Sequence, residues 1–173
     1  FGCLNAALGR IHLLVVGFGE FAFDLHLLFK LLPSNRILHL EIVPTDRIWS
    51  SPFIYKASEK AGADGVMIVT PYYNKPTQAG VLTHFRMIAD ATDLPVILYD
   101  IPGRAGIPIN FETILRAAKH PNIVAVKDAK GDFAQASRVM NETDLLYFSG
   151  DDGNVLPHLS IGATGLIGVT ANI

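Results

Sequence analysis

The sequence is poor in cysteine and has no excess of positive charge. Its 173 residues include one cysteine, Cys3, which excludes an internal disulfide and is typical of a reducing compartment such as the cytoplasm. The 14 Lys and Arg residues against 16 Asp and Glu residues give a net charge of −2. We therefore expect neither nucleic acid nor a membrane surface as a partner. No G-x-G-x-x-G or G-x-x-x-x-G-K-[ST] turn follows a strand-like run, which argues against a nucleotide-binding sheet.

A hydrophobic stretch near the amino terminus is interrupted by charge. Residues 11–32 are apolar enough to suggest a membrane span, but they contain Glu20, Asp24 and Lys30, which are costly in a bilayer. The stretch has no clear basic start or cleavage site, so it does not resemble a signal peptide. We interpret it as the core of a soluble domain, since half of the chain is hydrophobic. Because the chain begins at Phe1, we expect residues upstream of it.

From residue 56 onward, short β-branched runs alternate with stretches of helical period. Strand, loop and helix repeat about every 25–30 residues, which predicts a parallel sheet with right-handed crossovers. Before residue 56 the signals are weaker, with strands at 12–17 and 37–43 and a helix between them. The other predicted strands are 65–70, 96–100, 123–128, 145–149 and 165–170, and the predicted helices are 52–61, 78–92, 111–119, 133–142 and 155–161.

The polar residues favour a (β/α)₈ barrel over an open doubly wound sheet. Tyr72, Tyr73, Arg104, Lys127 and Asp151 all lie at or just after a strand end. Functional groups at four successive junctions are typical of a barrel mouth. In the tyrosine pair, one side chain is expected to pack and the other to face a cleft or a subunit interface. The sequence therefore predicts an α/β fold, an incomplete (β/α)₈ TIM barrel.

Lys127 ends an apolar strand, Ile123-Val124-Ala125-Val126-Lys127-Asp128. A lysine at the end of a buried strand loses hydration, which lowers its pKa, and the neutral amine is a nucleophile for a carbonyl carbon. The alternative is that the side chain snorkels to the surface or pairs with Asp128. The surrounding polar residues favour the first interpretation.

Tyr99 and Arg104 can converge on Lys127 across a barrel mouth. A Schiff-base enzyme requires an amine, a nearby proton shuttle and a cation for the substrate carboxylate, and these residues supply the last two. Arg104 stands between Gly103 and Ala105 in a loop opened by a proline, which favours a positioned guanidinium. The alternatives are a core aromatic for Tyr99 and a surface charge for Arg104.

The acidic pair Asp151-Asp152 lacks the companions of a metal site, because the histidines lie at unrelated places in the repeat. We expect the pair to cap the following helix. The segment GATG at 162–165 is expected to form a tight turn before a strand, rather than a phosphate site. No metal and no organic cofactor is predicted.

Five segments in chain order resemble one enzyme family. Across residues 56–173 the chain is similar to the dihydrodipicolinate synthases, pyruvate-dependent class I aldolases built on a (β/α)₈ barrel. The segments are TPYYNKP (70–76), YDIPGR (99–104), VKDAKGD (126–132), SGDD (149–152) and GATGLIGVTAN (162–172).

The resemblance implies a lyase that condenses pyruvate with L-aspartate 4-semialdehyde to 4-hydroxy-tetrahydrodipicolinate, in the diaminopimelate route to lysine. It implies a covalent imine between Lys127 and pyruvate, with Tyr99 and Tyr73 in the proton relay and Arg104 binding the semialdehyde carboxylate. In the family, the tyrosine matched by Tyr73 reaches the neighbouring subunit's site, which implies a homo-oligomer, a dimer of dimers. The remaining implied substrate-binding positions are backbone groups of Gly150 and Ile167.

The amino-terminal part departs from the family. The family's second strand ends in a glycine, two threonines, a glycine and a glutamate. The most similar segment here, Val15-Val16-Gly17-Phe18-Gly19-Glu20, lacks threonine. Thr45 resembles the threonine that ends the family's third strand, which is a different position. We hypothesise that residues 1–55 are a divergent or corrupted barrel portion and that 56–173 carry the Schiff-base lysine. Two alternatives remain open: another pyruvate-imine aldolase, such as a sugar-acid or sialic acid lyase, and a non-catalytic carboxylate-binding homologue.

Overall fold

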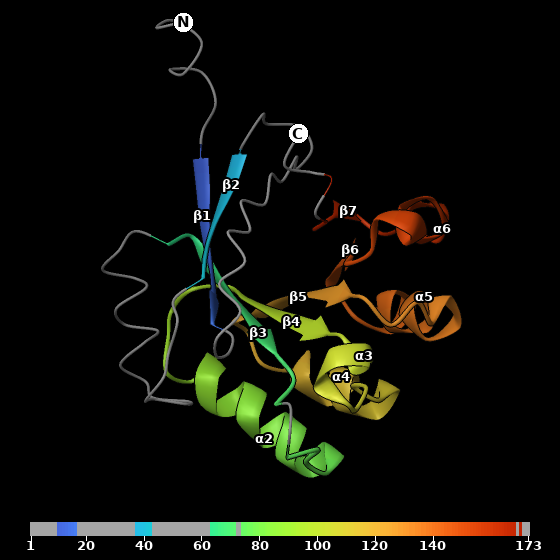
Figure 1. The fold of residues 1–173 in the computed structure, drawn as a ribbon. Coiled ribbons are helices and arrows are strands. Elements are labelled where there is room, and N and C mark those ends of the chain that lie inside the picture. Colours follow the sequence, from blue (N-terminus) through green and yellow to red (C-terminus); the bar gives the residue numbers. More distant parts are fainter. Residues whose placement is uncertain (1–9, 17–36, 43–62, 72–73, 169, 171–173) are drawn as a thin grey trace, which may run out of the picture.

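The chain forms one parallel sheet with helices along it (Figure 1). The computed structural model describes residues 10–16, 37–42, 63–71, 74–168 and 170. The sheet has seven strands in the order β2-β1-β3-β4-β5-β6-β7, and every neighbouring pair is parallel. The strands are β1 (Arg10–Val16), β2 (Ile37–Ile42), β3 (Gly65–Val69), β4 (Val96–Asp100), β5 (Ile123–Asp128), β6 (Leu146–Ser149) and β7 (Gly165–Leu166).

Two of the helices, α2 and α5, begin where a polar side chain satisfies a free backbone N–H group. The Thr77 hydroxyl accepts from Gly80 N at the start of α2, and the Asp132 carboxylate accepts from Gln135 N at the start of α5. The helices are α2 (Gln78–Ala89), α3 (Pro102–Ala105), α4 (Phe111–Ala117), α5 (Phe133–Glu142) and α6 (Val155–Ser160), with a 3₁₀ turn, η1, at Asp152–Asn154.

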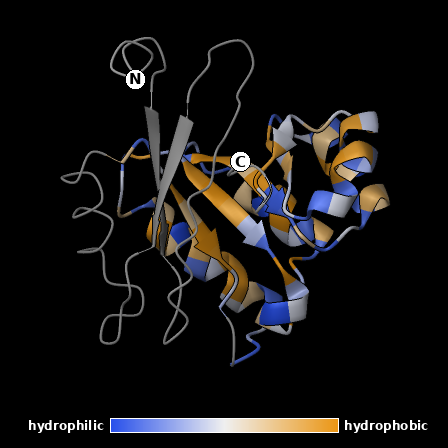
Figure 2. Ribbon diagram, turned by 45° about the horizontal axis from the view of Figure 1, so that its top comes forward, coloured by the Kyte–Doolittle hydropathy of each residue, from blue (hydrophilic) through white to orange (hydrophobic). Residues whose placement is uncertain are grey.

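The described core lies between the strands and the inner faces of α2, α4 and α5. Phe85 of α2, Ile114 of α4 and Val139 of α5 are buried against strand residues such as Leu98 and Val126. Figure 2 shows the same division, with largely hydrophobic strands beside helices in which hydrophobic and hydrophilic residues alternate. Burial of these apolar faces is what holds the helices in register along the sheet.

The first two strands do not follow chain order in the sheet. A barrel built in sequence would place the strand at 37–42 next to β3, but β1 occupies that place and β2 forms the edge. The sequence offers a reason: β1 contains the apolar run Leu13–Val16, which suits a central parallel strand, whereas β2 alternates with His39 and Glu41. Charged residues are typical of an edge strand.

Two rows of residues cross the sheet where β4, β5 and β6 end. The register sets Tyr99, Lys127 and Phe148 side by side, and the next residues along each strand also align. Because successive side chains on a strand point to opposite faces, these two rows face opposite ways. The second row faces the helix layer and is buried, and it consists of Asp100, Asp128 and Ser149.

Each strand and helix predicted from residue 63 onward is present, but several are shorter than predicted, and the strand predicted over 165–170 covers only Gly165–Leu166. The helix predicted to 92 ends at Ala89, where Asp90 donates its N–H to the Arg86 carbonyl. The helix predicted over 111–119 ends at Ala117, and the loop before it contains the unpredicted short helix α3. The predicted helices at 52–61 and between β1 and β2 lie outside the described residues. No helix in the described part of the chain is long and apolar enough to cross a membrane.

Candidate active site

Lys127 is buried at the carboxyl end of β5, with 4% of its surface exposed. Burial lowers the pKa of its amine from 10.5 to about 8, and the negative charge of Asp152 opposes part of that shift. A larger share of the amine is therefore neutral near pH 8 than for an exposed lysine. Neither alternative from the sequence holds, because the side chain does not snorkel and Asp128 directs its carboxylate elsewhere, to the backbone N–H groups of Lys130 and Gly131.

Tyr99 lies beside Lys127 on the neighbouring strand. The Lys127 Nζ atom is 4.1 Å from the centre of the Tyr99 ring, over its face. Burial raises the pKa of the Tyr99 phenol to about 12, with the Arg104 guanidinium acting in the opposite direction. The phenol therefore keeps its proton at neutral pH and remains a donor, which suits a group that passes protons to and from an adjacent amine.

Gly150 provides the space in which the Lys127 side chain lies. A Cβ atom at this position would come within 3.1 Å of the Lys127 Cε atom and within 3.0 Å of the Ala129 Cβ atom. The Gly150 N–H donates to the Asp128 carbonyl over 2.7 Å, which holds the end of β6 against the end of β5. The absence of a side chain at Gly150 is therefore what allows the lysine to lie in this position.

Asp152 belongs to the site, although the sequence assigned it only a capping role. Its charge acts on the Lys127 amine, and its Oδ1 atom accepts from the Thr170 hydroxyl over 2.7 Å. The predicted cap of the following helix is not formed, because the N-cap residue of α6 is Asn154 and makes no side-chain cap hydrogen bond. Asp151 alone caps the preceding turn η1, where its side chain accepts from Gly153 N. The acidic pair thus divides into one capping residue and one residue near the amine. The position of Asp152 shortly after the end of β6 was the feature of the sequence that could have indicated its place in the site.

The other predicted site residues differ in how near to Lys127 the structure places them. Arg104 is exposed on α3, near enough for its charge to act on Tyr99. Ile167 is fully buried and donates its N–H to the Ser149 carbonyl over 2.8 Å, so it lies beside the end of β6. Tyr73 and Thr45 lie outside the described residues. The structure therefore brings Lys127, Tyr99 and Gly150 together.

Among the described residues, no group of three or more His, Cys, Asp or Glu side chains is placed to hold a metal ion.

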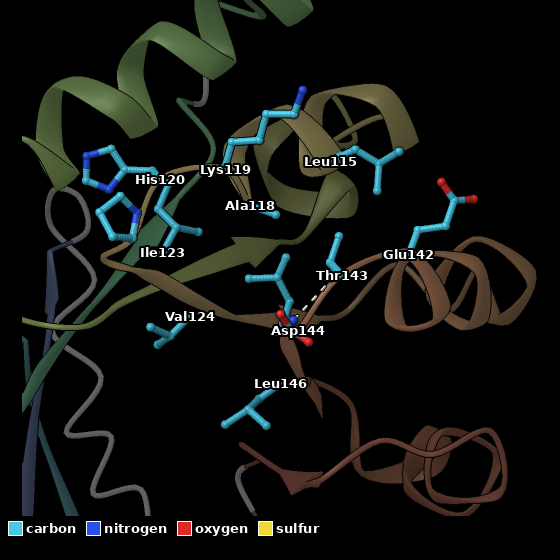
Figure 3. A pocket seen from close by; sticks show the side chains of 12 residues that line it. Leu115, Ala118, Lys119, His120, Ile123, Val124, Glu142, Thr143, Asp144 and Leu146 are labelled. Atoms are coloured by element: carbon cyan, nitrogen blue, oxygen red, sulfur yellow. Dashed lines mark hydrogen bonds between the residues drawn. The ribbon is translucent and has the colours of Figure 1, made fainter.

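A pocket of about 650 Å³ lies at the end of β5 and β6 opposite to Lys127 (Figure 3). It is lined by Ile123 and Leu146, where β5 and β6 begin, by Glu142 at the end of α5, and by Lys119 and Asp144 from the turns before the two strands. It is therefore separate from the groups around Lys127.

Comparison with known proteins identifies the family. The model of the dihydrodipicolinate synthetase family matches residues 53–173. The chain belongs to that family. A 4-hydroxy-tetrahydrodipicolinate synthase from Acidothermus cellulolyticus is 62% identical over 116 residues, which are 67% of this chain and 38% of that protein. This confirms the resemblance drawn from the five sequence segments.

Solved dihydrodipicolinate synthases have the same fold over their shared length. The enzyme from Cyanidioschyzon merolae with lysine bound is 39% identical, with a TM-score of 0.69 over 82% of this chain and 49% of that one. The chloride-inhibited enzyme from Acinetobacter baumannii complexed with pyruvate is 40% identical, with a TM-score of 0.67 over 78% and 48%. These likenesses confirm the predicted fold class, an incomplete (β/α)₈ barrel. The chain spans less than half the length of these relatives.

Proposed function

We propose that this protein is a 4-hydroxy-tetrahydrodipicolinate synthase, a class I aldolase that condenses pyruvate with L-aspartate 4-semialdehyde in lysine biosynthesis. The observation that carries the proposal is the buried Lys127 amine, with a pKa lowered to about 8, over the face of a protonated Tyr99. Membership of the dihydrodipicolinate synthetase family supports it, as does the pyruvate complex of the A. baumannii relative.

In the proposed reaction, the neutral Lys127 amine attacks the keto carbon of pyruvate. The carbinolamine loses water to give an imine, and Tyr99 donates a proton to the departing oxygen. The imine draws electrons from the methyl carbon, which loses a proton and becomes an enamine. No metal or organic cofactor is needed, because the protonated imine is the electron sink.

The enamine carbon then attacks the aldehyde of the semialdehyde, whose carboxylate is held by Arg104 through paired hydrogen bonds. The substrate's own amine displaces Lys127 and closes the ring, which returns the lysine to its free form. Gly150 and Ile167 contribute backbone groups to the pyruvate pocket, and Tyr73 completes the proton relay from a neighbouring subunit. The protein is accordingly proposed to be a cytoplasmic homo-oligomer, a dimer of dimers.

Reduction with borohydride in the presence of pyruvate tests the proposal. Reduction turns the imine into a stable secondary amine, and peptide mass mapping is expected to place the modification on Lys127. A turnover assay with aspartate semialdehyde then tests the second substrate. An adduct without semialdehyde turnover would favour a sugar-acid or sialic acid lyase, and no adduct would favour a non-catalytic carboxylate-binding homologue.

A further inference from the structure

A buried ion pair lies directly behind the candidate active site. Asp100 follows Tyr99 in the chain and is 1% exposed, and its Oδ2 atom is 3.2 Å from the Lys130 Nζ atom. The Lys130 side chain is itself only 14% exposed. Because Asp100 belongs to the row that faces the helix layer, this pair is on the opposite side of the strands from Lys127.

The ion pair is closed into a ring by the backbone of Ile109. The Ile109 N–H donates to Asp100 Oδ1 over 3.1 Å, and the Ile109 carbonyl accepts from Lys130 Nζ over 3.2 Å. Gln135 of α5 donates to the same carbonyl over 3.1 Å. The segment between Asp100 and Ile109 contains α3 and Arg104, so the ring closes the base of the loop that carries the arginine.

A second set of contacts fixes where Lys130 lies relative to Lys127. The Asp128 Oδ1 atom accepts from the backbone N–H of Lys130 over 2.7 Å and of Gly131 over 3.0 Å, forming a tight turn. The Ala129 N–H donates to the Asp100 carbonyl over 2.8 Å. The loop after β5 is thus bound to the end of β4 through both backbone and side chain.

We propose that Lys130 is a positioning residue, whose ammonium clamps the Arg104 loop and the end of β4 onto the strand end that carries Lys127. This inference rests on the proposed function for its catalytic consequence, whereas the clamp itself is a property of the fold. Lys130 stands three residues after Lys127, yet its contacts with Asp100 and Ile109 give it a structural task instead of a nucleophilic one.

Loss of the Lys130 charge would leave Asp100 buried without its cation. Burial raises the pKa of the Asp100 carboxyl to about 6, and the negative charge of Asp128 acts in the same direction. The Lys130 ammonium and the Ile109 N–H only partly offset these two effects. Without the ammonium, the pKa of the carboxyl rises further, so above about pH 6 the variant either keeps a proton that the parent chain has lost or holds a buried unpaired charge. The effect of removing Lys130 should therefore depend on pH.

The first measurement is hydrogen exchange, which does not depend on activity. In the full chain, Lys130→Met is expected to speed exchange of the amides in residues 101–109 about tenfold or more at neutral pH. Lys119→Met, which removes an exposed lysine in the turn after α4, should leave that segment unchanged. If Lys130→Met does not fold, Asp100→Asn, which breaks the same pair from the other side, serves instead. Unchanged exchange in 101–109 would overturn the clamp.

The second measurement is the rate of pyruvate trapping by borohydride. The rate for Lys130→Met relative to the parent chain is expected to be close to one below about pH 6, where Asp100 is protonated in both chains. It should fall to about a tenth near pH 8, where only the parent chain has the ionised pair. The control Lys119→Met keeps the Asp100–Lys130 pair, so its ratio should not vary with pH. If the ratio of trapping rates for Lys130→Met does not change with pH, Lys130 contributes only packing, and the positioning role is overturned. If the parent chain traps no pyruvate, the proposed function fails for this chain and hydrogen exchange alone decides the clamp.

Discussion

Tyr99 and Lys127 stand opposite each other in the register of β4 and β5, and the lysine Nζ atom is 4.1 Å from the ring centre. Two effects of opposite sign therefore act on the amine. Burial favours its neutral form, while the electron-rich face of the ring favours its charged form. Burial lowers the pKa of the amine to about 8 against the charge of Asp152, so the amine is both reactive and able to regain its proton near neutrality.

The rate of adduct formation should follow the ionisation of Lys127. Because only the neutral amine attacks pyruvate, the initial rate of borohydride trapping should rise from about pH 6 to about pH 9, with its midpoint near the lysine pKa of about 8. Mass spectrometry of the reduced adduct at a series of pH values gives the profile. A midpoint near 10, the value of an exposed lysine, would contradict the burial of the reacting amine.

Lys127 should also lower the stability of the fold at neutral pH. Its folded pKa of about 8 lies below the unfolded value of 10.5, so between these values the unfolded state holds more protons and stability rises with pH. Lys127→Met should raise the free energy of unfolding at pH 7 by a few kcal/mol, at about 1.4 kcal/mol per pKa unit.

Urea denaturation at several pH values measures this difference, which should shrink as pH rises from about 8 to about 10.5. The matched control Lys119→Met removes an exposed lysine and should show no such pH dependence. An equal response of the two variants would mean that Lys127 does not lose hydration on folding.

Two substitutions at Tyr99 should separate proton transfer by its hydroxyl from the effect of its ring on the Lys127 amine. Tyr99→Phe keeps the aromatic face over Lys127 but removes the hydroxyl, so trapping should slow by about 10²-fold or more while its pH midpoint stays in place. Tyr99→Leu removes both, and the loss of the ring should shift the midpoint to lower pH. Trapping rates across pH distinguish the two. A full rate with Tyr99→Phe would remove the phenol from the mechanism.

Gly150→Ala should impair the site through a steric clash. The new Cβ atom would lie within 3.1 Å of both the Asp128 carbonyl oxygen and the Lys127 Cε atom, and the backbone oxygen cannot yield easily. We expect adduct formation to fall at least tenfold, since small displacements of reacting groups are costly. Gly153→Ala is the control, because the nearest atom there is 4.0 Å away. Far-ultraviolet circular dichroism should show that both variants keep their helices.

His158 should tolerate an aromatic replacement better than truncation. Its Nδ1 atom pairs with the Asn154 carbonyl over 2.9 Å, but its buried Nε2 atom has no hydrogen-bond partner and lies 3.7 Å from Asp128 Oδ2. The ring also packs edge-on against Phe133. His158→Phe keeps this packing and removes the unpaired nitrogen, so stability should change by about 1 kcal/mol or less. His158→Ala should cost about 2–4 kcal/mol through the cavity that it opens. Urea unfolding compares them, and an equal loss in both would assign the stability to a contact of the imidazole nitrogens.

The sequence predicts the strands and the chemistry of their ends well, because both depend on local patterns. Apolar β-branched runs that end in a tyrosine or a lysine are visible in the sequence, and so are the residues that begin α2 and α5. The short helix α3 was missed because Pro102-Gly103 reads as a loop. There the Ile101 carbonyl accepts from both Arg104 N and Ala105 N, and Gly106 ends the turn with a φ of 79°.

Contacts between distant residues could not be predicted in this way. The pairing of Asp100 with Lys130 joins residues thirty positions apart, and nothing in either local pattern indicates that both are buried. The different roles of Asp151 and Asp152 also depend on a distant contact, the hydrogen bond from the Thr170 hydroxyl to Asp152. The order of β1 and β2 in the sheet also departs from the chain order that the barrel pattern suggests.

The alternation between the two rows at the strand ends limits how the length of β5 can vary. Removing or adding one residue within Ile123–Val126 would exchange the faces of its last two positions. After a deletion, the Asp128 carboxylate would stand beside the Tyr99 ring, and after either change the Lys127 ammonium would face the helices. Insertions and deletions in this region are therefore tolerable only in the connections before and after the strand.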